Sequence, residues 1–165
     1  MTSPAPTRPP EPSVRRLMLR GPLATLRLPL PDLFTTLHAA VVLVVVEVAV
    51  RRLPLPRLCQ LLGVRLNLAP APPDAERIRV RDLPPKAARQ VRCTRRVADG
   101  WPFSRGPCLR RALVTGNLLR RLDPALRLGV GGSGHEVVGH AWLEIHDRPL
   151  EDIAAFSLFQ QVPIH

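Results

Sequence analysis

The segment from Pro107 to Asp152 contains a cysteine, a histidine and an aspartate in an order that suits thiol-dependent acyl chemistry. Cys108 stands where a helical pattern begins, His140 opens an apolar-alternating run, and Asp152 follows a turn-like segment. A nucleophilic cysteine needs a base, and the base needs an acceptor that orients it. These residues predict a cysteine hydrolase in which Cys108 attacks, His140 transfers the proton and Asp152 holds the imidazole.

The position of Cys108 favours its thiolate. A free cysteine has a pKa of about 8.5, and the thiolate is the reactive form. The first turn of a helix favours negative charge, and Pro107 suits the first helical position because its missing N–H would be unpaired anyway. From local sequence alone, a buried structural cysteine is an equal alternative. Cys59 and Cys93 lack such a setting, and we interpret both as structural.

The loop between the last two expected strands decides whether His140 and Asp152 can meet. Alternating apolar residues predict strands at Leu126–Val130, Val137–His146 and Leu150–Ala154. Side chains alternate between the two faces of a sheet, so His140 and Asp152 share a face only if the loop has an odd number of residues. The triad therefore requires a three-residue loop at His146–Arg148, or a bulge.

The remaining elements are expected to be mostly helical. Cys108–Leu122 has an apolar stripe opposite an arginine-rich face, which predicts an amphipathic helix. Asp32 is the expected N-cap of a helix at Leu33–Arg52. This apolar segment includes His38 and Glu47 and stops short of the roughly 20 apolar residues of a membrane span. We expect a buried helix there, although its valines also permit a strand.

Three regions follow from composition. Residues 1–31 form a segment rich in proline and arginine that is expected to be mobile. Residues 32–74 form an apolar helical region that packs on the core, with a helical turn at Leu58–Leu62 and a break at Ala69–Asp74. Residues 75–165 form the catalytic domain, which begins with a basic helical region interrupted at Pro84-Pro85.

The charge of +11 permits an acidic peptide, nucleic acid or an anionic membrane as partner. We expect no nucleic acid, because the aromatic residues lie outside the arginine runs, and we do not expect a membrane. The odd number of cysteines and the absence of an apolar signal segment predict a cytoplasmic protein without disulfides. The cysteine spacing predicts no metal site.

The glycine-rich run at 129–134 matches the spacing G-x-G-x-x-G of dinucleotide-binding loops. That motif requires a helix to begin at the loop, whereas the residues from His135 to His146 are typical of a strand. We therefore expect no cofactor, and we expect a flexible loop beside the active site.

Three ordered motifs resemble the family of lasso-peptide leader peptidases, the transglutaminase-like B proteins of lasso-peptide biosynthesis. They are the helix beginning Cys108-Leu109-Arg110-Arg111-Ala112-Leu113, the strand Leu128-Gly129-Val130, and the strand His140-Ala141-Trp142-Leu143-Glu144. Cys108, His140 and Asp152 fall on the catalytic residues of this family. The resemblance implies an α+β fold with a papain/transglutaminase-like core, in which the nucleophile begins a helix packed on a small antiparallel sheet.

The resemblance also implies an activity and partners. The activity would be cleavage of a ribosomally made precursor peptide through an acyl-enzyme. The partners would be that leader-bearing precursor, a separate small leader-binding protein, and a lasso cyclase. The backbone N–H of Cys108 is the expected oxyanion donor. Two alternatives stay open: an acyl transferase that uses the same triad and delivers the acyl group to an amine, and a non-catalytic basic adaptor that binds an acidic peptide or a membrane surface.

Overall fold

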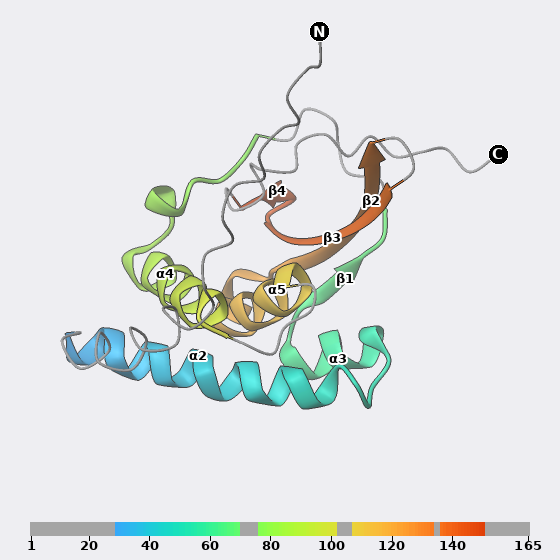
Figure 1. Cartoon of the computed structure of the whole chain (residues 1–165). Coiled ribbons are helices and arrows are strands. Elements are labelled where there is room, and N and C mark those ends of the chain that lie inside the picture. The colour runs from blue at the N-terminus through green and yellow to red at the C-terminus, as the bar shows by residue number, and fades with distance from the viewer. Residues whose placement is uncertain (1–28, 70–75, 102–106, 134–135, 151–165) are drawn as a thin grey trace, which may run out of the picture.

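The computed structural model describes residues 29–69, 76–101, 107–133 and 136–150, which form helices packed on one side of a small mixed sheet (Figure 1). The helices are α2 (Leu30–Ala49), α3 (Leu55–Leu62), α4 (Pro85–Asp99) and α5 (Pro107–Leu118). The strands are β1 (Arg65–Asn67), β2 (Ala125–Ser133), β3 (Glu136–Ile145) and β4 (Arg148–Pro149). The sheet order is β1-β2-β3-β4, with β1 parallel to β2 and the other pairs antiparallel. The fold is α+β, as expected.

Helix α5 is the central element, because it contacts α2 and α4 on one side and β2 and β3 on the other. Leu113 and Val114 in its middle are fully buried. Gly116 allows its close approach to the sheet, since a Cβ there would lie 2.7 Å from Val64 Cγ2 and 3.3 Å from Leu143 Cδ2. The helix begins at Pro107, as expected, but ends at Leu118, and a 3-10 turn follows at Arg120–Leu122.

Helix α2 runs along the lower edge of the molecule in Figure 1 and packs on α4 and α5. It is a helix rather than a strand despite its valines, and its core-facing residues include Ala39, Leu43 and Val46. The expected N-cap was wrong: Pro29 precedes the helix, and Asp32 lies in its first turn. There the Asp32 carboxylate pairs with Arg89 of α4 at 3.3 Å. Pro29 is extended and directly precedes the first turn, so the helix begins at Leu30, three residues before the expected Leu33.

The glycine run lies in a strand, which corrects the expectation of a flexible loop at Gly131–Gly134. Strand β2 continues through Ser133 and pairs with β3 as far as Glu136. Gly134 itself lies outside the described residues. Strand β1, which the sequence analysis did not identify, pairs with β2 over three residues.

The β3–β4 connection has two residues, so the expected three-residue loop at His146–Arg148 was wrong. Ile145 pairs with Arg148, and the loop residues His146 and Asp147 have φ values of +52° and +58°. Two consecutive left-handed residues match the type I′ turn, whose twist suits a tight hairpin. The register continues one residue further, because the Leu150 N–H donates to the Leu143 carbonyl at 3.0 Å.

Candidate active site

Cys108 and His140 line the same small cavity, of about 60 Å³, between α4, α5 and β3. The other lining residues come from those elements and from the residue after β4: Val91, Arg111, Ala112, Thr115, Ala141, Trp142, Leu143 and Leu150. The fold therefore brings together two of the three residues that the sequence singled out, from positions 32 residues apart in the chain.

Cys108 is the second residue of α5 and is half-buried. The first N–H groups of an α-helix have no partner within the helix, so its backbone N–H can serve an incoming oxygen. Cys59 and Cys93 differ, because each is only 1% exposed. Burial raises the pKa of the Cys59 thiol, and the Cys93 thiol lies 3.7 Å from the Asp32 carbonyl oxygen. Among the three cysteines, Cys108 is the accessible one.

His140 lies on β3 opposite Gly129 of β2 and stacks on Trp142. The ring centroids are 6.1 Å apart and the planes differ by 17°. Burial lowers the pKa of His140, and the nearby positive charge of Arg111 lowers it further. Both causes favour the neutral imidazole, which is the form that can accept a proton from a thiol.

Arg111 is a cavity residue to which the sequence analysis assigned no role. It lies three residues after Cys108, so the two share a helix face. Its Nη2 donates to Asp99 Oδ1 at 2.8 Å, which ties it to the end of α4. Its Nε is buried and has no hydrogen-bond partner among the described residues. The i, i+3 spacing from Cys108 was the signal that could have identified Arg111 as a cavity residue.

A buried charge pair supports Trp142 from the side away from His140. The indole Nε1 donates to Glu144 Oε1 at 3.3 Å. Glu144 is 1% exposed, and its Oε2 approaches Arg127 Nε to 2.6 Å. This approach is a close charge contact and not an aligned hydrogen bond, since neither atom meets the hydrogen-bond geometry. Arg127 also donates from Nη1 to the Ala69 carbonyl. Arg127 and Glu144 hold each other in place, and Glu144 in turn holds Trp142. This network therefore stabilises the face of β3 on which His140 lies.

Asp152, the expected third residue of the triad, lies outside the described residues. The described part of the hairpin narrows the hypothesis. Ile145 pairs with Arg148, so the loop has two residues, and the three-residue loop that the triad was expected to need does not form. Of the two options, the bulge stays open. Within the described residues, no three His, Cys, Asp or Glu side chains form a group that could hold a metal ion.

Comparison with known proteins identifies the family. A family model described as the transglutaminase-like superfamily matches residues 40–162. No curated protein and no solved structure matched the chain. The match covers most of the sequence and includes α5, β2 and β3, which carry the cavity. The chain therefore belongs to the transglutaminase-like superfamily, which includes cysteine-peptidase-like and acyltransferase members.

Proposed function

We propose that this chain is a cysteine peptidase that removes the leader from a ribosomally made lasso-precursor peptide. The observation that carries the proposal is the meeting of two sequence motifs at one cavity. Cys108 and Arg111 of the first motif line it, as do His140 and Trp142 of the second. These motifs lie on different elements, so their meeting at one cavity is a property of the fold, independent of the sequence resemblance itself.

The proposed reaction has two steps. In the first, His140 accepts the Cys108 proton while the sulfur attacks the scissile carbonyl, and the oxygen charge develops towards the first N–H groups of α5. The C–N bond then breaks, His140 gives its proton to the departing amine, and a thioester remains on Cys108. In the second, His140 takes a proton from water, the hydroxide displaces the sulfur, and the thiol is regenerated. Asp152 orients the imidazole throughout.

The lowered pKa of His140 favours one of two forms of catalysis at this site. A thiolate–imidazolium pair in the resting enzyme would require a stable positive charge on His140. Burial and the Arg111 charge both oppose that charge. The proposal therefore assigns His140 as a neutral general base that removes the thiol proton during attack.

The partners in this proposal are the precursor peptide, a separate small leader-binding protein that delivers it, and a lasso cyclase that acts on the freed core. The proposed compartment is the cytoplasm, where a free nucleophilic thiol stays reduced. The +11 charge of the chain suits an acidic leader peptide, since opposite charge accelerates encounter.

The test is mass spectrometry of a synthetic precursor after incubation with the enzyme and the leader-binding protein. Wild-type enzyme is expected to yield free leader and free core. Cys108→Ala is expected to leave the precursor intact. Cys93→Ser is the matched control, because it also removes one thiol but lies in the core away from the cavity. Full cleavage of the precursor by Cys108→Ala would contradict the peptidase proposal.

The same experiment separates hydrolysis from acyl transfer. With an added primary amine, a peptidase still produces the free leader acid as its main product. An amine adduct of the precursor that forms without chain cleavage would instead establish the transferase alternative, with the same cysteine and histidine.

A further inference from the structure

The outward face of α2 carries an apolar stripe, in which His38 is an exposed polar residue. The apolar residues fall at the spacings of one helix face, are 39–70% exposed, and are Leu30, Leu33, Phe34, Leu37, Val41, Val44, Val45 and Val48. A helix of 20 residues is about 30 Å long, so the stripe is far larger than the scattered apolar exposure of ordinary surfaces. A stripe of this length indicates a surface that is covered in the functional state.

The inward face of α2 is held in the protein. Ala39, Leu43 and Val46 are at most 1% exposed. Glu47 accepts from Arg110 of α5 at 2.5 Å and from Arg51 at 2.6 Å. By length and hydropathy alone α2 could cross a membrane, and 28% of its most apolar window is buried in the protein. Crossing would require this charge pair to be broken and the buried residues to leave the core. The helix therefore presents its stripe while it stays docked.

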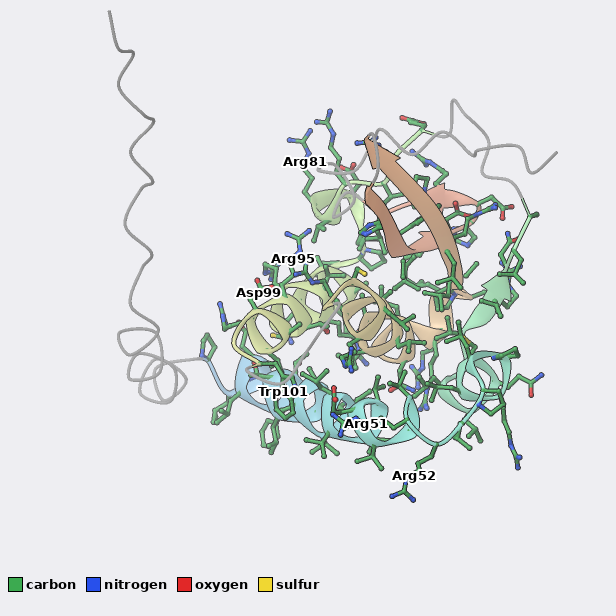
Figure 2. All side chains as sticks on the ribbon, turned by 45° about the vertical axis from the view of Figure 1, so that its right-hand side comes forward. Arg51, Arg52, Arg81, Arg95, Asp99 and Trp101 are labelled. Atoms are coloured by element: carbon green, nitrogen blue, oxygen red, sulfur yellow. The ribbon has the colours of Figure 1, made fainter. Side chains whose placement is uncertain are left out.

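Positive charges stand at both ends of the stripe. At the C-terminal end Arg51, Arg52 and Arg57 are exposed, and Figure 2 shows Arg52 projecting outward below α2. At the N-terminal end Phe34 borders a cavity of about 440 Å³ whose cationic lining residues are Lys86, Arg120 and Arg121.

The acidic residues of α2 offset Arg51 but not the other five of these cations. Asp32 pairs with Arg89, and Glu47 pairs with Arg110 and Arg51. A second copy of the chain would bring the same cations against this surface, which disfavours self-association. The charge pattern instead fits an anionic partner.

The shape of the surface distinguishes a lipid bilayer from an acidic protein helix. A bound helix is normally received in a groove between elements. Here α2 is an outermost ridge, with α4 and α5 both on its inner side (Figure 1). A ridge of apolar side chains with cations at its ends matches a helix that lies in the plane of an anionic membrane surface.

We propose that α2 docks this protein on anionic lipid, with the apolar stripe at the level of the headgroups and acyl chains. Arg52 and Arg57 at one end, and Lys86, Arg120 and Arg121 at the other, then face lipid phosphates. The contact is peripheral, and it departs from the expectation that no membrane is involved. It is independent of the proposed peptidase activity, because the cavity of Cys108 and His140 uses no residue of α2.

The experiment is co-sedimentation of the full chain with vesicles. Mixed phosphatidylglycerol–phosphatidylcholine vesicles are compared with pure phosphatidylcholine. Wild type is expected to bind the anionic vesicles, and Leu37→Asp and Val44→Asp are each expected to bind about tenfold less tightly or worse. Leu68→Asp is the matched control, since it adds the same charge at an apolar residue that is 71% exposed beyond β1. It is expected to bind within about twofold of wild type.

Further variants separate the contributions. Arg52→Gln/Arg57→Gln is expected to weaken binding to anionic vesicles only, and added salt is expected to do the same. Urea unfolding of each variant verifies that the exposed substitutions leave the fold intact. Cys108→Ala is expected to bind vesicles like wild type. The vesicle experiment can therefore be interpreted even if the peptidase proposal fails.

Three results would overturn the proposal. The first is that wild-type protein binds neither kind of vesicle. The stripe would then be assigned to a contact with a protein. The second is equal binding by wild type and Leu37→Asp, which would show attraction by charge alone. The third is a wild-type dimer in analytical ultracentrifugation that Val44→Asp dissociates, with no affinity for vesicles.

Discussion

The imidazole of His140 and the indole of Trp142 are stacked, with ring centroids 6.1 Å apart, two residues apart on β3. Alternate residues of a strand share a face, so the pair follows from the strand itself. What holds the indole is less local. Glu144 binds its nitrogen, and Gly129 on the neighbouring strand leaves room for its ring. The orientation of His140 therefore depends on a glycine in a different strand.

In the proposed peptidase, Gly129→Ala is expected to lower the rate of precursor cleavage. The added Cβ would lie 2.8 Å from Trp142 Cζ3, so the indole must move, and with it the ring stacked on it. A displacement of about 1 Å at a catalytic group costs roughly 10- to 100-fold in kcat/KM. Gly139→Ala is the control, because it adjoins His140 in sequence but its Cβ would meet nothing within 4 Å. Equal losses in both variants, measured by cleavage kinetics, would contradict this dependence.

Arg111→Gln is expected to raise the pKa of His140. Burial and the Arg111 charge hold that pKa below its usual 6.5, so removing the charge removes the second of the two causes. The imidazole then stays protonated to higher pH, while burial keeps its pKa below the usual value. The measurement is an NMR titration of the His140 ring, which does not depend on activity. Asp99→Asn retains the Arg111 charge and is expected to leave the midpoint of His140 at or below its wild-type position. An unchanged midpoint in Arg111→Gln would refute the role of the charge.

Iodoacetamide is expected to modify Cys108 before the other two cysteines. Cys108 is half-buried at the start of α5, whereas Cys59 and Cys93 are 1% exposed in the core. Alkylation requires an accessible thiolate, and burial also raises the pKa of Cys59. Peptide mapping after brief labelling of the native protein measures the order. In native buffer we expect Cys108 alone to be labelled. In urea we expect all three cysteines to be labelled at similar rates.

The helices and the two long strands could be predicted because their signals are local. The apolar spacing of α5 and the alternation in β3 are readable within a dozen residues. Cys108 and His140 could be named as candidates for the same reason, since each stands at a recognisable place in its element, and the fold places both at one cavity. Strand β1 could not be predicted, because its three residues are a strand only through their parallel pairing with β2, about 60 residues away.

The turn after β3 shows a different limit. A type I′ turn is usually signalled by Asn-Gly or Asp-Gly, and His146-Asp147 offers neither. The sequence therefore permitted several loop lengths, and a single residue reverses the face of everything beyond it. The contacts around Trp142 are likewise tertiary. Arg127 and Glu144 look like surface charges in the sequence. They are buried in the fold, where β2 and β3 pair so that Arg127 lies opposite Trp142 and Glu144 lies opposite Ala125.

Gly116→Ala is expected to destabilise the protein even though alanine is the better helix former. The new methyl would lie 2.7 Å from Val64 Cγ2, and overpacking of this kind costs about 1–3 kcal/mol. The gain in helix propensity offsets at most about 1 kcal/mol. In a Val64→Ala background the same substitution is expected to cost little, because the clashing methyl is gone. Urea unfolding of the four proteins gives the coupling energy, and additive effects would contradict the proposed contact.

Glu47→Gln is expected to be far more damaging than Arg51→Gln, although both break an ion pair of α2. The Glu47 and Arg110 side chains are 11% and 13% exposed, and their atoms approach to 2.5 Å. Removing the Glu47 charge takes a close carboxylate partner from the buried Arg110 guanidinium and costs about 3 kcal/mol or more. The Arg51 side chain is 65% exposed, so its loss should cost less than about 1 kcal/mol.

The pH dependence gives the Glu47 prediction its sharpest form. The hydrogen bond from Arg110 is the main cause that holds the pKa of Glu47 below its ordinary value of 4.5, against the opposing effect of burial. A lowered carboxylate pKa contributes stability that is fully present above the unfolded value and is lost as the pH falls through the folded one. The difference in unfolding free energy between wild type and Glu47→Gln should therefore be constant near neutral pH and shrink below about pH 4.5. A difference that stays constant through the acid range would show that the pair stabilises the protein by packing rather than by charge.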